Sequence, residues 1–398
     1  MTIHCIWTRN LDVPYSAGRL KIARNIRASL DGASPVHHVL TTVLERKSPI
    51  EIGHAAWNGL RQRLPLQSWL FDTAANRHIA DTIPLDTEVA YLDGIRTVQI
   101  LETLRQRLPK ARLVVDFDDL MSRRIEALME AGEGLSTGYL SDSIPRWGRR
   151  LAQTSNTGLR YEHGALRRWE IRVCELADEV VLLSPVEAAI LNSRLPPSAR
   201  ATIRVVPPPQ DTIRGPQALK PPLRFIFIGM DTLTQNRLAI EYLLDLWRRL
   251  SPPTPLHIFG RMSREWPAAP NVFFHGYVSS LEQVYDQHSI LLSPVLLRGG
   301  IKTKVLEAFA WGTPVVGNEG TFEGMTLPHY PIKDPLEQVV IDVRNSRRLD
   351  ELNAAAHIGN EYVRQHHDPG LISDTWRSLV GGLRLYGSPN QALSPQSA

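Results

Sequence analysis

The sequence predicts an α/β protein with two doubly wound parallel sheets, and three observations lead to this prediction. The chain has 398 residues, which exceeds the usual size of a single domain. Short apolar runs typical of buried strands alternate with helical patterns along most of its length. A proline-rich and polar stretch, residues 207–222, separates two such series and is typical of an interdomain linker.

The first series lies within residues 1–206, which we expect to form an N-terminal α/β domain. Runs rich in Val, Ile and Leu predict its strands, and apolar residues at helical spacing predict its helices. The expected strands are 3–7, 36–43, 89–92, 113–117 and 179–184, and the expected helices include 19–30, 98–108 and 170–177. Between them, residues 121–165 are polar, with helical content but little periodicity.

The second series predicts a C-terminal α/β domain over residues 223–371. Its expected strands are 225–229, 256–260, 272–276, 290–295 and 314–317, and its expected helices include 238–250 and 304–311. The polar residues 385–398 are expected to form a disordered tail. Because strands that alternate with helices form parallel sheets, we expect ligand sites at the carboxyl ends of the strands, in a cleft between the domains.

Composition and charge exclude several classes of protein. The chain has two cysteines, Cys5 and Cys174, which argues for a reducing compartment and against a disulfide framework. Its first residues do not resemble a signal peptide, and no apolar run approaches the ~18 residues that cross a bilayer. We therefore expect a cytoplasmic protein, or one that lies on the cytosolic face of a membrane. The net charge is only +4, and no nucleic-acid module is recognisable, so nucleic acid is not an expected partner.

The excess positive charge falls within residues 1–206, and part of it is clustered. Arg146, Arg149 and Arg150 surround Trp147. Basic residues beside an interfacial aromatic ring suit an anionic membrane surface or a phosphorylated acceptor. A solvated helix face explains the same pattern equally well, so both interpretations stay open.

The most informative segment of the chain is residues 298–307, which read Arg-Gly-Gly-Ile-Lys-Thr-Lys-Val-Leu-Glu. An expected strand precedes it, and an expected helix begins within it. Glycines allow a ligand to approach the backbone, and the free amides at a helix N-terminus favour negative charge. The chain has only seven lysines, yet Lys302 and Lys304 lie in this turn. The pattern indicates a site for an anion, most simply a nucleotide diphosphate; a surface turn with solvated lysines is the alternative.

This segment and its surroundings resemble a known family. The matching residues are Phe227-Ile-Gly229, Gly276-Tyr-Val278, Ser293-Pro294, the run Gly-Gly-Ile-Lys-Thr-Lys-Val-Leu-Glu-Ala-Phe-Ala-Trp-Gly-Thr-Pro-Val-Val at 299–316, and Glu323-Gly324. Over roughly residues 223–330 they resemble the C-terminal half of family-four glycosyltransferases, the group 1 enzymes of the GT-B fold. Residues 114–123 and 180–184 resemble the N-terminal half more loosely. The resemblance implies two Rossmann-like domains, with a last helix at 372–384 crossing back to the first.

The resemblance also implies roles for individual residues. Lys302 and Lys304 would oppose the diphosphate of a nucleotide sugar and stabilise the charge of the leaving group. Glu307 matches a glutamate that accepts hydrogen bonds from the ribose hydroxyls. Gly299 stands where many members have another glutamate, so contacts to the donor sugar must come from elsewhere. The expected donor-binding residues are Gly229, Asn236, Arg298, Gly299, Gly300, Ile301, Thr303, Glu307 and Glu323.

A second constellation, Asp116-Phe-Asp118-Asp119, follows an expected strand of the N-terminal domain. Asp118 or Asp119 is expected to act as a general base or to orient the acceptor, and with the two lysines they complete the expected catalytic groups. Two other interpretations are a divalent-metal site and an Asp119 that caps the following helix. We favour the first interpretation because the lysines already supply positive charge, so no metal is expected. The expected acceptor-side residues are Gly18, Arg19 and Asp116.

The sequence thus predicts a glycosyltransferase of hexosyltransferase type that uses a nucleotide-diphosphate sugar as co-substrate and no separate cofactor. Its expected acceptor is a glycan or a lipid-linked molecule, in polysaccharide or glycoconjugate biosynthesis. A retaining mechanism is implied by the resemblance alone. The alternatives are a nucleotide-sugar epimerase or hydrolase of the same fold, and a catalytically silent relative that binds a nucleotide sugar.

Overall fold

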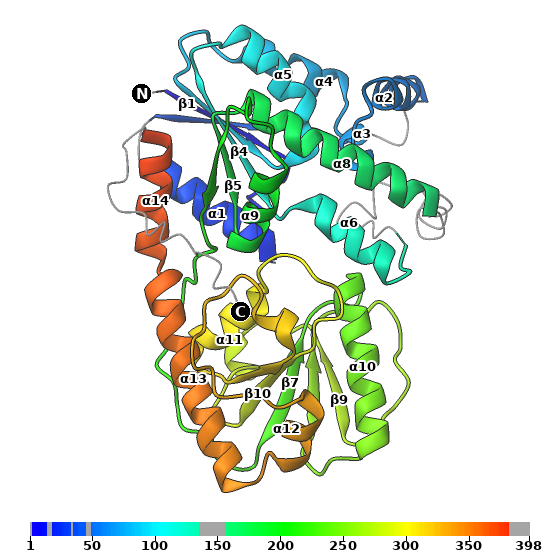
Figure 1. Ribbon diagram of the computed structural model, residues 1–398, viewed down its shortest axis with the longest axis vertical. Helices are drawn as coiled ribbons and strands as arrows, with labels where there is room; N and C mark the ends of the chain where they lie inside the picture. Colours follow the sequence, from blue (N-terminus) through cyan, green and yellow to red (C-terminus); the bar gives the residue numbers. More distant parts are fainter. Residues whose placement is uncertain (1, 14–17, 33–34, 45–48, 135–155, 382–398) are drawn as a thin grey trace.

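The computed structural model describes residues 2–13, 18–32, 35–44, 49–134 and 156–381 and consists of two α/β halves (Figure 1). The first half contains a six-stranded sheet in the order β2-β1-β3-β4-β5-β6, in which every neighbouring pair is parallel. Its strands are β1 (Ile3–Trp7), β2 (Val36–Leu40), β3 (Val89–Asp93), β4 (Arg112–Asp118), β5 (Glu179–Leu182) and β6 (Thr202–Val205).

Helices cover both faces of this sheet. They are α1 (Gly18–Asp31), α2 (Pro49–Gln62), α3 (Leu66–Trp69), α4 (Ala74–Thr82), η1 (Ile95–Thr97), α5 (Val98–Arg107), α6 (Met121–Glu130), α8 (Asn156–Leu176) and α9 (Pro185–Arg194). Because side chains alternate along a strand, Ile3, Cys5 and Trp7 of β1 pack in the cluster on one face, whereas Ile6 packs in the cluster on the other. Both clusters are buried, which is why the strands of this half read as nearly continuous apolar runs.

The second half contains a five-stranded parallel sheet in the order β11-β10-β7-β8-β9. Its strands are β7 (Arg224–Ile228), β8 (Leu256–Phe259), β9 (Val272–Gly276), β10 (Ser289–Ser293) and β11 (Val315–Gly317). Its helices are α10 (Thr234–Leu250), η3 (Leu281–Gln283), α11 (Thr303–Ala310), η4 (Glu319–Phe322), α12 (Leu336–Asp342) and α13 (Ser346–His366). Doubly wound parallel sheets are thus present in both halves, as the sequence predicted.

The last described helix, α14 (Pro369–Gly381), packs against the first half (Figure 1). Its Trp376 is 2% exposed and lies edge-on to Tyr91 of β3, with ring centroids 5.9 Å apart. Ile372 and Leu379 belong to the same buried cluster as residues of α1. The expected helix at 372–384 therefore begins about one turn earlier, and its expected residues 382–384 and the expected tail at 385–398 lie outside the described residues.

Each sheet has one point at which the strand order reverses. In the first sheet the chain runs from β1 outward to β2 and then returns to β3 on the other side of β1. In the second sheet it runs from β7 outward to β8 and β9 and then returns to β10 on the other side of β7. Open α/β sheets bind their ligands at the carboxyl ends of the strands beside such a reversal. The edges after β1 and β3, and after β7 and β10, are therefore the places to look for a site.

None of the helices in the described ranges is both long enough and apolar enough to span a membrane. The arginine cluster at Arg146, Arg149 and Arg150 falls within residues 135–155, outside the described part of the chain.

Candidate active site at the carboxyl ends of the two sheets

The glycine turn after β10 adopts a conformation that requires glycine. Gly299 and Gly300 have φ angles of +125° and +64°, which side-chain-bearing residues rarely adopt. A Cβ on Gly300 would lie 2.4 Å from Oδ1 of Asp119, so a larger residue here would displace that carboxylate of the first half. The turn ends at Lys302, the N-cap of α11, and the buried Ile301 anchors it in the core. It therefore presents the N-terminus of α11 toward the first half.

Lys304 lies at the reversal point of the second sheet. Its Nζ is 4.1 Å from the centre of the Phe227 ring of β7 and donates a hydrogen bond to Oδ1 of Asn236, at 2.9 Å. Burial, followed by the nearby charge of Lys302, lowers the pKa of Lys304 to about 7. The ammonium group has a single described hydrogen-bond acceptor and no described carboxylate partner, so an anion at this position would be strongly stabilised.

Asn236 and Gly229 complete this part of the site. Asn236 belongs to the first turn of α10, and its Nδ2 donates to the carbonyl of Met230, at 3.0 Å. A Cβ on Gly229 would lie 2.6 Å from Nδ2 of Asn236, so the glycine allows the amide side chain to pack directly against the end of β7. The structure thus brings together three expected site residues, Gly229, Asn236 and Lys304, from two strand ends.

Lys302 points back along its own turn. Its Nζ donates to the carbonyls of Gly299 and Gly300, the latter at 2.7 Å. Burial lowers its pKa, although the carboxylates of Glu323, Asp119 and Glu187 act in the opposite direction. Lys302 therefore lies among negative groups of both halves, and its side chain must rotate to contact an anion beside Lys304.

Glu307, one turn further along α11, is half-buried. Its Oε2 accepts a hydrogen bond from the hydroxyl of Tyr285, at 3.1 Å. Burial raises its pKa, and Lys21 of α1 acts in the opposite direction, which places this carboxylate within electrostatic reach of the first half. The remaining oxygen, Oε1, has no described hydrogen-bond donor, so the side chain can still accept from a diol.

The other expected donor-side residues have different surroundings from one another. Thr303 begins α11 and is half-buried, and Glu323 pairs with Arg123 of α6. Arg298 is exposed, and no hydrogen bond or ion pair joins it to another described residue. The role of Arg298 in donor binding stays a prediction.

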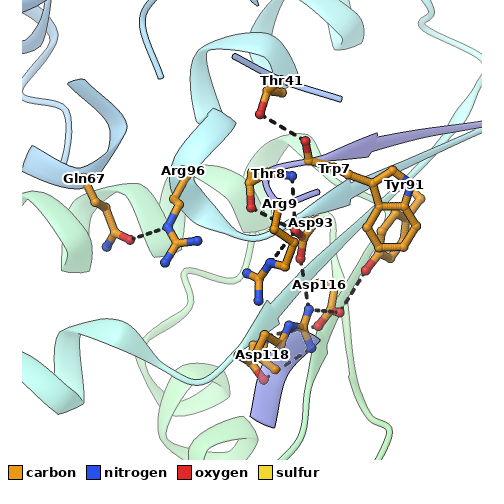
Figure 2. A network of polar contacts seen from close by, with 11 residues as sticks. Trp7, Thr8, Arg9, Thr41, Gln67, Tyr91, Asp93, Arg96, Asp116 and Asp118 are labelled. Carbon is orange, nitrogen blue, oxygen red and sulfur yellow. Dashed lines mark hydrogen bonds and ion pairs between the residues drawn. The ribbon is translucent and has the colours of Figure 1, made fainter. Parts of the chain in front are cut away.

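In the first half, three aspartates lie at the ends of β3 and β4, namely Asp93, Asp116 and Asp118 (Figure 2), and Arg19 forms an ion pair with each of them. Its guanidinium donates to Asp93 at 3.2 Å, to Asp118 at 3.3 Å, and to Asp116, which also accepts from the hydroxyl of Tyr91 at 2.9 Å. Asp93 and Asp116 are fully buried. Asp116 and Asp118 thus converge on the guanidinium of Arg19. Gly18 starts α1 with a φ of +28° and is exposed.

Asp118 has an unusual backbone and an unusual pKa. Its φ is +67°, and the pairing of β4 with β5 shifts register between Asp116 and Asp118. Burial raises the pKa of Asp118 to about 7; the charge of Arg19 acts in the opposite direction, and those of Asp119 and Asp116 act in the same direction as burial. A carboxyl group with such a pKa at an exposed sheet edge can accept a proton near neutral pH.

Asp119 contacts the glycine turn of the other half rather than capping a helix. The N-cap of α6 is Leu120, which makes no side-chain capping bond, so the capping interpretation of Asp119 is wrong. Arg124 lies 3.7 Å from its Oδ2, and Gly300 packs against its Oδ1. Asp119 therefore lies where the two halves meet.

One residue of this interface was missed by sequence reasoning. Glu187, in the first turn of α9, is 1% exposed; its Oε1 accepts from the amide of Gly300 at 3.0 Å, and its Oε2 from the amide of Leu120 at 3.1 Å. Burial and Asp119 raise its pKa to about 7, against the effect of these two amides. The only signal in the sequence was an acidic residue after Pro185, which is common at helix starts.

Comparison with known proteins shows which family and which solved structures the chain is similar to. Residues 222–327 match the family model described as Glycosyl transferases group 1. No curated protein matches the chain.

Solved structures match almost the whole chain. Sucrose-phosphate synthase from Thermosynechococcus elongatus is 14% identical, with a TM-score of 0.62 over 96% of this chain and 98% of that one. Anabaena HepE in complex with UDP-glucose is 11% identical, with a TM-score of 0.57 over 96% and 100%. The lipopolysaccharide outer core galactosyltransferase WaaB is 14% identical, with a TM-score of 0.52 over 96% and 99%. The resemblance drawn from the sequence is confirmed: the chain has the GT-B fold, and its second half carries the sequence pattern of group 1 glycosyltransferases.

Proposed function

We propose that this protein transfers a hexose from a nucleotide-diphosphate sugar to a glycan or lipid-linked acceptor in the cytosol, with retention of configuration. The observation that carries the proposal is the position of Lys304, held between Phe227 and Asn236 at the reversal point of the second sheet. A buried ammonium group beside a helix N-terminus matches the charge of a diphosphate. Retention and the biosynthetic setting rest on the family resemblance.

The chemistry follows from the charge that develops during transfer. As the bond between the sugar and the diphosphate breaks, negative charge accumulates on the leaving oxygen. Lys304, and Lys302 after rotation, would stabilise that charge, and the amides of the glycine turn would add hydrogen bonds. Asp118 would then orient the acceptor hydroxyl or take its proton, because its pKa of about 7 suits that role.

A thermal-shift screen against UDP, GDP, ADP and their common sugar conjugates, with and without magnesium, tests the donor. Because the Anabaena neighbour contains UDP-glucose, UDP-glucose is the first conjugate to try. A ligand that binds only the native state at about 100 times its Kd stabilises it by about 2.7 kcal/mol. We expect a selective shift with one nucleotide, independent of magnesium. No shift with any nucleotide would contradict the proposal. Product formation that needs no acceptor would favour an epimerase or hydrolase.

The pKa of Lys304 predicts how donor binding depends on pH. A diphosphate binds the protonated amine, and this pKa is about 7 in the free protein, so binding takes up a proton above that pH. Affinity for UDP-glucose, whose own charge is constant in this range, should therefore rise as the pH falls from about 8.5 to about 6.5, by at most about tenfold per pH unit for one proton. Protonation of Glu187 removes the negative charge that now accepts a hydrogen bond from the Gly300 amide. The amide is then free to bind the diphosphate, so this protonation also raises the affinity as the pH falls.

Calorimetric titration at several pH values, in buffers of different ionisation enthalpy, measures both the affinity and the proton uptake. In Lys304→Met the slope should be smaller, because the amine that takes up the proton is gone, although Glu187 still titrates. An affinity that does not change with pH in the wild-type protein would contradict this assignment.

A further inference from the structure

Two arginines at the reversal point of the first sheet have donor groups that the fold does not use. Arg9 follows β1, and its Nε donates to Asp93 at 2.9 Å; Arg96 lies in η1 after β3, and its Nε donates to Gln67 at 3.2 Å (Figure 2). Within the described ranges, no acceptor is found for the terminal Nη groups of either side chain. Both side chains are half-buried at the carboxyl edge, where a parallel sheet binds its ligands.

The carboxylates around these two arginines already have other partners. Asp93 already accepts from Thr8 and Arg19 as well as from Arg9, and Arg19 is shared among three carboxylates. Burial and the charge of Arg9 lower the pKa of Arg96 to about 10, so the two arginines lie close enough to repel each other. A negatively charged group between them would relieve that repulsion.

We propose that Arg9 and Arg96 bind a phosphate group carried by the acceptor. A phosphate offers several oxygens in a tetrahedral arrangement and can accept from two guanidinium groups at once, and its charge of nearly −2 matches two cations better than the single charge of a carboxylate. That the phosphate belongs to the acceptor rests on the proposed function, because Asp118 and the glycine turn separate this edge from the expected diphosphate site.

Asp118 is a carboxylate that could repel such a ligand, because its charge acts on Arg96. Because its pKa is raised to about 7, it can take up a proton when a phosphate binds nearby. Asp93, by contrast, stays ionised: burial raises its pKa, but Arg9 and Arg19 outweigh burial and lower it to about 2. The fixed negative charge of Asp93 is already paired with Arg9 and Arg19. It therefore does not prevent an anion from binding to the terminal Nη groups of Arg9.

The test compares Arg9→Gln and Arg96→Gln with a matched control, Arg200→Gln. Arg200 lies just before β6, at the opposite edge of the same sheet, where it pairs with Asp178 and is half exposed. One experimental arm measures binding of glucose 6-phosphate against glucose. The other measures binding to phosphatidylcholine vesicles with and without a polyprenyl phosphate. These arms separate a soluble sugar phosphate from a lipid-linked phosphate.

We expect the wild-type protein to prefer the phosphorylated probe in at least one arm, and each Gln variant to bind that probe about 10- to 100-fold more weakly. Arg200→Gln should bind like the wild type. Arg96→Lys keeps the charge but loses the planar fork, so its affinity for the probe should lie between those of the wild type and Arg96→Gln. It is the variant to measure if Arg96→Gln does not fold. Equal binding by wild type and both Gln variants, or no preference for phosphate in either arm, would overturn the proposal.

Failure of the phosphate site can be distinguished from failure of the proposed function. Nucleotide binding is assigned to the second half, so Arg96→Gln should keep the wild-type thermal shift with the nucleotide that the screen selects. A wild-type protein that binds glucose 6-phosphate but no nucleotide would refute the proposed donor site and leave the phosphate site standing.

Discussion

Lys304→Met should lower turnover with a nucleotide-sugar donor by about 10²- to 10³-fold, because it removes a charge that stabilises the leaving diphosphate. Methionine has nearly the same length and can keep the contact with Phe227. The only described hydrogen bond that it loses is the one to Asn236. A steady-state assay of sugar transfer measures the effect.

The fold should survive this substitution. Burial lowers the pKa of Lys304 from its unfolded value to about 7, so the unfolded chain binds more protons between these two values. The buried amine therefore costs stability as the pH falls from about 10 to about 7, and Lys304→Met removes that cost. The melting temperature at neutral pH should equal or exceed that of the wild type. The exposed Lys333→Met is the matched control and should change neither quantity; turnover of Lys304→Met within about twofold of wild type would contradict the assignment.

Arg19→Met should destabilise the protein by about 3 to 5 kcal/mol, because it removes the shared partner of three carboxylates. Asp116 is affected most: it is fully buried, and Tyr91 would be its only remaining side-chain donor in the described structure. Urea unfolding gives the free-energy difference from the midpoint and slope.

The matched control for this substitution is Arg27→Gln on the same helix, α1. Arg27 pairs with Asp12 and Asp31 at the surface, where such pairs contribute roughly 0 to 1 kcal/mol. Arg19 is the charge that most lowers the pKa of Asp118 against burial, so without it this pKa rises further above about 7, and the part of the deficit that comes from Asp118 should disappear as the pH falls toward 7. A loss no larger than that of Arg27→Gln would show that the aspartates do not depend on Arg19.

The local patterns of this sequence predicted much of the fold and the second half of the site. Apolar runs place the strands, and the glycines, lysines and helix start at 299–304 lie within one short segment, so their chemistry is readable without tertiary information. Long-range pairings are different. Arg19 meets Asp116 across 97 positions, and Glu187 meets Gly300 across 113. No local period encodes such contacts, because they depend on how the sheets and halves pack.

The same limit explains the elements that sequence reasoning missed. Strand β6 has an exposed edge and only four residues, so its apolar signal is weak. Helices α2 to α4 lie between an early strand and β3, and the one cap signal among them, Thr73 before α4, was overlooked. Arg9 and Arg96 become neighbours only because β1 and β3 pair in the sheet.

The most direct test of the account is a crystal structure of the protein with UDP, or with whichever diphosphate the screen selects. The account predicts the diphosphate beside Lys304, against the amides of the glycine turn, with Lys302 rotated toward it and Glu187 withdrawn from the amide of Gly300. A diphosphate bound instead between Arg9 and Arg96 would contradict the assignment of the donor to the second half.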